Sequence, residues 1–377
     1  MNQQIPTRQP SRSPQRSQPP RTPNQRQYVP RQKSVKIGLA STMIVVFVIT
    51  LILLVISLVL LCVALAVDGE DKPAAIEPMG NAQQEEVSNT PTGSKKPLYS
   101  TVPSRSDYFI ENSSSYQTVS GIDSEYTILL DLSSYEAVAG LNADTRICPA
   151  SMTKIMTLLI ACENITSLTE KVTVSAASVT YQANHGASGL AWTGGEVLSV
   201  EDLLYLIYFR SDTVACLTMA EYLAGSEANF VSMMNQKAEK LGLRDTYFTN
   251  STGLKISGEN YYTTCREMAM IMAYALDNPL AKKVMTQTGS WYLPESAPVE
   301  YVRPTWVTDR FAGNAVLDTV TIKAAKTGWE DEPGACLVSY AESGNGKQYI
   351  NVIVGGNGLS ATKSTADVKA IYKNYAK

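Results

Sequence analysis

The chain has 377 residues, with 32 Lys and Arg side chains against 35 Asp and Glu, and a single histidine. Residues 1–36 hold eight of the basic side chains and no acidic one, so the remaining residues carry a net charge of −11. An acidic remainder excludes a basic nucleic-acid-binding domain, and one histidine excludes a zinc site built from several histidines.

The first 67 residues divide into a polar segment and an apolar segment. Residues 1–36 are rich in Pro, Gln, Arg and Ser, which predicts a disordered tail, because such a segment cannot bury enough surface to offset its ordering entropy. Residues 37–67 contain no charge and no proline, and they exceed the roughly 20 residues that cross a bilayer. We therefore expect an uncleaved transmembrane anchor there. The basic side chains precede it, so the positive-inside rule predicts a single-pass cell-membrane protein with a cytoplasmic N-terminus and an extracellular domain.

The part of the chain after the anchor is expected to hold a linker and one folded domain. Residues 68–105 are acidic and rich in Pro, Gly and Ser, which predicts a flexible linker. Residues 106–377 suit a single two-lobed domain.

Strand-like patterns lie at both ends of this domain, and helical patterns lie between them. "EYTILLDLSS" and "YEAVAGL" predict an antiparallel pair, and "TVTIKAAKTG", "GACLVSYAES" and "KQYINVIVGG" predict three more strands. Helical periodicity covers 151–163, 200–209, 212–224, 226–241 and 263–277, and "KSTADVKAIYKNYA" predicts a last amphipathic helix. We expect an α+β fold in which strands from both ends share one sheet, with the site in a cleft beside a helical lobe.

The cysteines and the histidine indicate which chemistry to expect. Cys62 falls in the apolar run, and the other five cysteines are widely spaced without a Cys-x-x-Cys pair. This spacing favours small buried side chains over a disulfide framework, although it leaves one bridge open. His185, in "YQANHGASGL", is predicted to be an exposed loop residue. Acid–base chemistry is therefore expected to depend on Lys, Ser or a carboxylate.

The segment "RICPASMTKIMTLLIACEN" predicts a buried helix that begins at Ser151. Lys154 follows three residues later, so both side chains share one face of that helix. Helix amides beside Ser151 would face a developing oxyanion, and burial of Lys154 would lower its pKa and make it available as a base. An N-capping serine next to a solvated lysine accounts for the same pattern.

Two further segments carry candidate polar groups. Lys326, Thr327 and Gly328 end a predicted strand, and they offer a cation, a hydroxyl and an unhindered backbone for the carboxylate of a β-paired peptide. An ordinary strand end followed by a turn glycine would look the same. "Ser211-Asp212-Thr213" opens a predicted helix, for which a plain N-cap is the alternative interpretation. All three segments in this order match the serine acyltransferases that penicillin inhibits.

Residues 124–355 resemble the low-molecular-weight penicillin-binding proteins, which are D-alanyl-D-alanine carboxypeptidases. The likeness extends through "DLSSYEAVAGLNADTRICPASMTKIMT", "GGEVLSVEDLLYLIYFRSD", "AEYLAGSEANFVSMMNQKAEKLGLRDTYFTNSTGL" and "YYTTCREMAMIMAYAL". The resemblance implies the β-lactamase/DD-peptidase-like fold, with an antiparallel five-stranded sheet, flanking helices and a helical lobe. It also implies a serine peptidase that trims peptidoglycan stem pentapeptides through an acyl-enzyme, needs no metal or cofactor, and is inhibited by β-lactam antibiotics.

The same resemblance implies a role for each candidate residue. Ser151 would be the nucleophile, Lys154 its base, and Ser211 a proton relay to the departing D-alanine. The implied substrate-binding residues are Lys326, Thr327, Thr213, Gly328 and Trp329. Among them, Lys326 and Thr327 would hold the terminal carboxylate, and the amide of Trp329 would join that of Ser151 in an oxyanion hole.

Three positions depart from the family pattern. Thr213 stands where the family has Asn, which offers an amide donor and an acceptor in place of one hydroxyl. Trp329 is bulkier than expected, and Asn260 replaces a frequent His. Two alternatives follow: a weakly active or inactive wall-binding sensor of the same fold, and a class A β-lactamase. The second lacks support because no convincing Glu-x-x-x-Asn segment lies between Ser211 and Lys326.

Overall fold

The computed structural model of the chain describes residues 97–98, 116–306, 311, 316–331, 333–355 and 360–377. The predicted tail and transmembrane anchor lie outside these residues, and so does the predicted linker except for two positions. None of the helices formed by the described residues is both long enough and apolar enough to span a bilayer.

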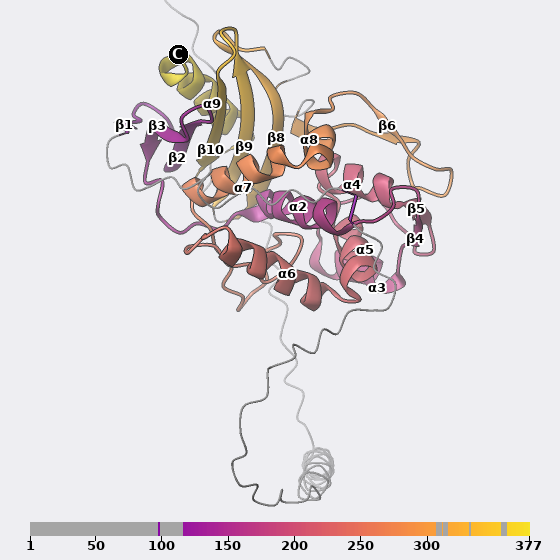
Figure 1. The fold of residues 1–377 in the computed structure, drawn as a ribbon. Coiled ribbons are helices and arrows are strands. Elements are labelled where there is room, and N and C mark those ends of the chain that lie inside the picture. Colours follow the sequence, from indigo (N-terminus) through magenta and orange to yellow (C-terminus); the bar gives the residue numbers. More distant parts are fainter. Residues whose placement is uncertain (1–96, 99–115, 307–310, 312–315, 332, 356–359) are drawn as a thin grey trace, which may run out of the picture. The chain divides into compact units, whose positions relative to one another are not determined.

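A six-stranded sheet joins the two ends of the domain in the order β1-β3-β2-β10-β9-β8 (Figure 1). Its strands are β1 (Gln117–Thr118), β2 (Tyr126–Asp131), β3 (Glu136–Leu141), β8 (Val320–Glu330), β9 (Gly334–Ser343) and β10 (Gln348–Val354). The predicted sharing of one sheet is confirmed, because β2 pairs antiparallel with β10, Asp131 opposite Tyr349.

The prediction of a five-stranded, fully antiparallel sheet was wrong in one respect. β1 adds a sixth strand and pairs parallel with β3, Gln117 opposite Ala139. A strand of two residues shows no alternation that a sequence pattern could reveal, and its direction depends on where the chain enters the domain. The long β8 lies at the opposite edge, so one side of it is left without a partner strand among the described residues.

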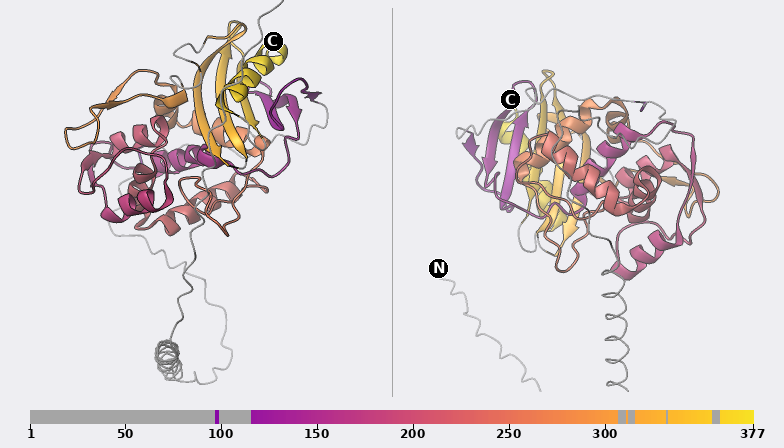
Figure 2. Two further views of the ribbon diagram at one scale, coloured as in Figure 1. Left: turned by 180° about the vertical axis from the view of Figure 1, so that it is seen from behind. Right: turned by 60° about the horizontal axis from the view of Figure 1, so that its bottom comes forward.

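Helices cover both faces of the sheet and form a separate lobe. They are η2, a 3₁₀ helix (Ala150–Thr153), α2 (Lys154–Asn164), α3 (Ala176–His185), α4 (Val200–Phe209), α5 (Thr213–Ala224), α6 (Glu227–Lys240), α7 (Cys265–Asp277), α8 (Pro279–Thr286) and α9 (Ala361–Tyr375). Helix α7 lies on one face of the sheet and α9 on the other, as the two opposite views show (Figures 1 and 2). The five predicted central helices and the last helix are confirmed, whereas α3 and α8 were not predicted.

Helix α2 is the centre of the core. Its residues from Lys154 to Cys162 are all buried, and it packs against α4, α5, α6 and α7. A helix that is buried on every side leaves no solvated position for a charged side chain. Lys154, at the first turn of this helix, therefore needs polar partners inside the protein, because a lysine is rarely buried without one.

Two short hairpins complete the described structure: β4 (Lys171–Thr173) with β5 (Val197–Ser199), and β6 (Trp291–Tyr292) with β7 (Tyr301–Val302). The five described cysteines are free thiols, so none of them forms a disulfide bridge. Four are buried, as predicted, and Cys148 is partly exposed.

Candidate active site

Ser151 and Lys154 lie together at the start of the buried helix. Lys154 Nζ donates a hydrogen bond to Ser151 Oγ at 3.2 Å. The Lys154 side chain is only 1% exposed, and this burial lowers its pKa. The predicted pairing on one face is confirmed. Ser151 itself lies in the 3₁₀ turn η2 and not in the α-helix, which begins at Lys154.

A loop carbonyl is the second partner of Lys154. Its Nζ donates to the backbone oxygen of Thr252 at 2.6 Å, a shorter contact than the one to Ser151. The turn that presents this oxygen is held by Asn250, whose Oδ1 accepts hydrogen bonds from the amides of Thr252 and Gly253 at 3.2 and 2.7 Å. Sequence reasoning missed this contact, because a backbone carbonyl has no side-chain signature.

Gly253 fits this turn tightly against the segment that holds the nucleophile. Its φ is +72°, in the left-handed region, and a Cβ at this position would lie 2.0 Å from the carbonyl oxygen of Ala150. Only glycine allows this approach. The turn is therefore fixed against the residue that directly precedes Ser151.

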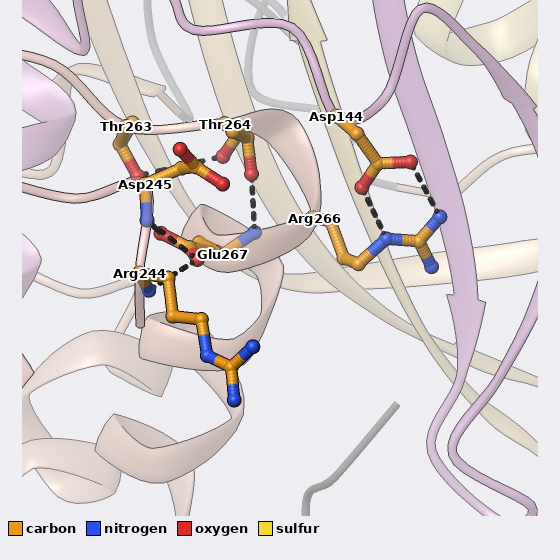
Figure 3. Close-up of polar contacts among 7 residues, drawn as sticks. All are labelled: Asp144, Arg244, Asp245, Thr263, Thr264, Arg266 and Glu267. Atoms are coloured by element: carbon orange, nitrogen blue, oxygen red, sulfur yellow. Dashed lines mark hydrogen bonds and ion pairs between the residues drawn. The ribbon is translucent and has the colours of Figure 1, made fainter. Parts of the chain in front are cut away.

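Side chains at the N-terminus of α7 hold the start of the segment that carries this turn and also the chain that leads to Ser151 (Figure 3). The carboxylate of Glu267 accepts hydrogen bonds from the amides of Arg244 and Asp245, at 2.8 and 3.0 Å. Arg266 forms a bidentate ion pair with Asp144, with contacts of 2.5 and 2.9 Å, close to the chain that leads to Ser151. The start of one helix thus holds both the segment that leads to the turn and the segment that leads to the nucleophile.

A second lysine–serine pair lies across from the first. Lys326 on β8 donates from Nζ to Ser211 Oγ at 3.0 Å, and its side chain is 1% exposed. Ser211 has a φ of +54°, which is rare for a residue with a Cβ, and Ser188 Oγ donates to its carbonyl oxygen at 2.7 Å. Strain of this kind persists where the surroundings impose it and is concentrated at functional sites.

The carboxylate of Asp212, the residue that follows this serine, holds the surrounding backbone through several hydrogen bonds. It caps α5 by accepting from the amide of Ala215 at 2.9 Å, and it also accepts from the Leu190 amide at 2.7 Å and from Trp192 Nε1. The carboxyl is fully buried, and its desolvation raises its pKa. The cap that was the alternative interpretation of this segment is present at Asp212, and the additional contacts tie the turn containing Ser188 and Leu190 to the start of α5.

Gly328 allows β8 to lie against the nucleophile. A Cβ at this position would lie 3.1 Å from the Ala150 Cβ and 3.2 Å from the Ser151 nitrogen. A larger side chain would push β8 away from η2. Next to it, Thr327 is half-buried, and the Trp329 side chain is 60% exposed.

These groups line one cleft of about 470 Å³. Its lining is made by Ser151, Lys154, His185, Gly186, Ala187, Ser188, Ser211, Thr213, Thr252, Leu254, Thr305, Thr327, Gly328, Trp329 and Glu330. All the predicted site residues line this cleft except Lys326, whose Nζ donates a hydrogen bond to Ser211 Oγ at the cleft.

The prediction that His185 lies in a loop was wrong. It is exposed, as expected, but it is the last residue of α3 and lines the cleft. The helix is capped by Ser175 and ends at Gly186, whose φ is +58°. Its mostly small or polar residues gave no clear apolar period, which concealed the helix. Asn260, by contrast, lines a different pocket.

Comparison with known proteins gives similar sequences along most of the described domain. Residues 112–358 match the family model described as D-alanyl-D-alanine carboxypeptidase. The D-alanyl-D-alanine carboxypeptidase DacF of Bacillus subtilis is 31% identical over 223 residues, which cover 59% of this chain and 55% of the relative. The D-alanyl-D-alanine carboxypeptidase DacA of Escherichia coli is 30% identical over 244 residues, which cover 62% of this chain and 57% of the relative. The chain spans about half the length of these curated relatives.

Solved structures share the fold. Penicillin binding protein 5 from Haemophilus influenzae superposes with a TM-score of 0.58 at 24% identity, covering 67% of this chain and 71% of that one. A mutant of the Streptomyces K15 DD-transpeptidase gives a TM-score of 0.58 at 23% identity, covering 67% of this chain and 98% of that one. At this identity the structures establish the architecture alone. Because the family model matches well over half of its residues, this chain belongs to the D-alanyl-D-alanine carboxypeptidase family.

Proposed function

We propose that this protein is a serine-type D-Ala-D-Ala carboxypeptidase that removes the terminal D-alanine from peptidoglycan stem pentapeptides. One observation carries the proposal: two buried lysines each hold a serine hydroxyl, Lys154 with Ser151 and Lys326 with Ser211, at the same cleft. A structural role for either pair would not require both lysines to be desolvated beside a hydroxyl that faces a cleft.

Lys154 acts as the general base in this proposal. Its lowered pKa increases the fraction of neutral amine. One N–H of the neutral amine remains on the Thr252 carbonyl, which turns the nitrogen lone pair toward Ser151 Oγ. The amine then accepts the hydroxyl proton as the serine oxygen attacks the carbonyl carbon of the penultimate D-alanine.

The other groups bind the substrate and its leaving group. The hydroxyl of Thr327 and the charge of Lys326 hold the terminal carboxylate, and the amides of Ser151 and Trp329 stabilise the oxyanion. Collapse of the tetrahedral intermediate breaks the peptide bond, and Ser211 passes a proton to the departing amine. Water then hydrolyses the acyl-enzyme. A β-lactam acylates Ser151 in the same way, and its ring-opened product remains attached.

Thr213 occupies the position where the family has Asn. It is 1% exposed, and its amide donates to the Ser188 carbonyl at 2.9 Å. The Thr252 carbonyl already supplies Lys154 with an acceptor, so the base does not depend on an amide at position 213. We assign Thr213 to substrate contact through its hydroxyl.

We also propose that residues 37–67 anchor the protein in the cell membrane, with the N-terminal tail in the cytoplasm and the domain outside, where peptidoglycan lies. The support is the uncharged length of this segment and the basic residues that precede it. Protease treatment of intact cells tests the orientation. The domain should be digested while a tag on the N-terminus is protected, and protection of the domain would contradict the proposal.

D-alanine release tests the activity. Wild-type protein should release D-alanine from a stem pentapeptide and form a covalent adduct with labelled penicillin, detected as a mass increase of the intact protein. Ser151→Ala should do neither. Release that survives this substitution would overturn the assignment. A penicillin adduct on wild-type protein without any D-alanine release would instead favour a sensor that has lost turnover.

A further inference from the structure

A polar groove of about 900 Å³ lies on helix α6 and on the chain segment that follows this helix. It shares no lining residue with the catalytic cleft, and the proposed reaction involves none of its side chains. Its lining is made by Ser232, Asn235, Gln236, Glu239, Gly242, Leu243, Arg244, Thr246 and Tyr247. Its volume lies in the upper part of the range of small-molecule sites, about 300–1,000 Å³.

One wall of the groove is a polar stripe on α6. The four residues of this helix in the lining follow the spacing i, i+3, i+4 and i+7, which places them on one face. The opposite face, with Phe230 and Met234, is buried in the core. The position of the stripe is therefore fixed by the packing of the helix.

The second wall is the chain from Gly242 to Tyr247, which returns beside α6. The Leu243 amide donates to the Ala238 carbonyl at 2.9 Å. Farther along, Asn235 binds both backbone groups of Phe248, because its Nδ2 donates to the carbonyl oxygen and its Oδ1 accepts from the amide, each at 2.8 Å. The returning segment is thus held to the helix at both ends, and the groove exists before any ligand binds.

Four exposed side chains give the groove its hydrogen-bonding groups. Gln236, Glu239, Arg244 and Tyr247 are all exposed, and none of these side chains forms a hydrogen bond or an ion pair with a described residue. In Figure 3 the guanidinium of Arg244 extends away from the contacts that are drawn. An amide, a carboxylate, a guanidinium and a phenol together supply both donors and acceptors to a ligand.

Tyr247 adds an aromatic face to these polar groups. Its side chain is 47% exposed, and its ring lies 6.3 Å from the ring of Tyr262, centroid to centroid. The backbones of the two tyrosines pair through hydrogen bonds of 2.8 and 3.0 Å, which fixes the position of the ring. An aromatic face beside planar polar groups suits a sugar ring, because the C–H face of the sugar packs on the aromatic ring while its hydroxyls bind the polar groups.

The charge of the groove favours an uncharged ligand. In the described lining, Glu239 and Arg244 are the charged residues, and their charges cancel. An anionic polymer would be matched by an excess of basic side chains. A peptidoglycan glycan strand is uncharged wherever its lactyl carboxylates are amidated by stem peptides, and it carries many hydroxyl and N-acetyl groups.

We infer that this groove binds the glycan strand of peptidoglycan, a polymer of N-acetylated sugars, apart from the cleft that receives the stem peptide. The choice of this ligand rests on the proposed function, which makes peptidoglycan the substrate. The groove lies on the same segment as the turn at Thr252, five residues before it at Tyr247. Binding there keeps the protein on the polymer after each stem peptide is released.

Peptide-free glycan strands test this inference. Amidase digestion of peptidoglycan removes the stem peptides, so these strands offer nothing to the catalytic cleft. Binding of the full chain in detergent to immobilised strands is measured by biolayer interferometry. Wild-type protein should bind, and Tyr247→Ala should weaken binding by about three- to tenfold, the range of one aromatic contact.

A second variant and a matched control accompany Tyr247→Ala. Gln236→Ala should weaken binding by about two- to tenfold, the equivalent of one hydrogen bond, and alanine is favourable in an exposed helix position. Tyr292 provides the control, because it is 67% exposed and its ring lies 5.7 Å from that of Tyr301, but it does not line the groove. Tyr292→Ala should bind as wild type does.

The remaining outcomes have distinct meanings. If wild-type protein does not bind peptide-free strands, or if Tyr247→Ala and Gln236→Ala both bind as tightly as wild type, the inference is wrong and the carboxypeptidase assignment stands. Binding that high salt abolishes would also contradict it, because an uncharged ligand is not screened. Strand binding by a wild-type protein that releases no D-alanine from a stem pentapeptide would overturn the proposed function and support the groove as a glycan site.

Discussion

Lys154 Nζ lies 2.6 Å from the backbone oxygen of Thr252, closer than its 3.2 Å contact with the nucleophile. The loop carbonyl therefore orients the amine before any substrate binds. A backbone acceptor cannot ionise, so it holds the base without supplying a charge that would raise the pKa of the lysine. The turn that carries Thr252 is consequently part of the catalytic arrangement that we propose.

The tight contact of Gly253 with Ala150 predicts a large effect of a single methyl group. Gly253→Ala should be destabilising for two reasons. The left-handed backbone costs alanine about 1–2 kcal/mol, and the collision with the Ala150 carbonyl oxygen costs about a further 1–3 kcal/mol. Gly121→Ala is the matched control, because Gly121 has the same φ of +72° and no described atom lies within 4 Å of the place that its Cβ would take. Chemical denaturation of both variants measures the difference, and equal losses would contradict the role given to the contact.

The lowered pKa of Lys154 predicts the pH dependence of acylation. The rate constant for penicillin acylation should rise with pH as the amine loses its proton, with a midpoint below the ordinary lysine value of 10.5. In Lys154→Arg the guanidinium remains protonated, so the rate should fall by at least about 100-fold, within the range of general-base contributions. Stopped-flow or mass-spectrometric acylation across pH measures both. The same rising limb in Lys154→Arg would show that another group is the base.

The lowered pKa of Lys154 also determines how the free energy of unfolding changes with pH. Because the folded-state pKa of Lys154 lies below its unfolded value, the unfolded chain binds more protons in the window between the two. The contribution of Lys154 to the free energy of unfolding should therefore rise with pH across that window. Lys154→Met should flatten this part of the stability profile, and an unchanged slope would show that Lys154 does not cause it.

Thr213 allows a direct test of the departure from the family pattern. Thr213→Asn should maintain or raise D-alanine release, because the amide restores a donor and an acceptor beside the substrate. Thr213→Val keeps the shape and removes the hydroxyl, and we expect it to lower kcat/KM by about tenfold, the equivalent of one hydrogen bond. Steady-state release assays compare the three proteins. Full activity in Thr213→Val would show that the Thr213 hydroxyl does not contact the substrate.

The buried Asp212 predicts that a tryptophan outside the chemistry supports Ser211. Trp192→Phe removes the indole N–H that donates to the Asp212 carboxylate at 3.0 Å, and it should lower the free energy of unfolding by about 1–3 kcal/mol. Trp291→Phe removes a similar bond, to Asp202 at 2.9 Å, from a side chain that is only half-buried, so water can replace the donor and the loss should be smaller. Thermal denaturation ranks the two variants. If Trp291→Phe lost as much stability as Trp192→Phe, or more, burial would not explain the importance of the bond to Asp212.

Much of the local structure was predictable because periodicity and caps are local properties. The apolar period after Ser151 indicated the buried helix, and with it the shared face of Ser151 and Lys154. The alternation around Lys326 indicated the strand. Each of these signals lies within a few residues, so the sequence contains it directly.

Only the tertiary structure brought Thr252 to Lys154, Ser211 to Lys326 and Glu330 into the cleft. These contacts join residues that lie 75 to 115 positions apart in the chain, and their partners include a backbone carbonyl and residues with ordinary local patterns. Hydrophobic periodicity states which face of an element is buried but not which element covers it. The local sequence determined the helices and strands, whereas the packing of the two lobes determined which polar groups share one cleft.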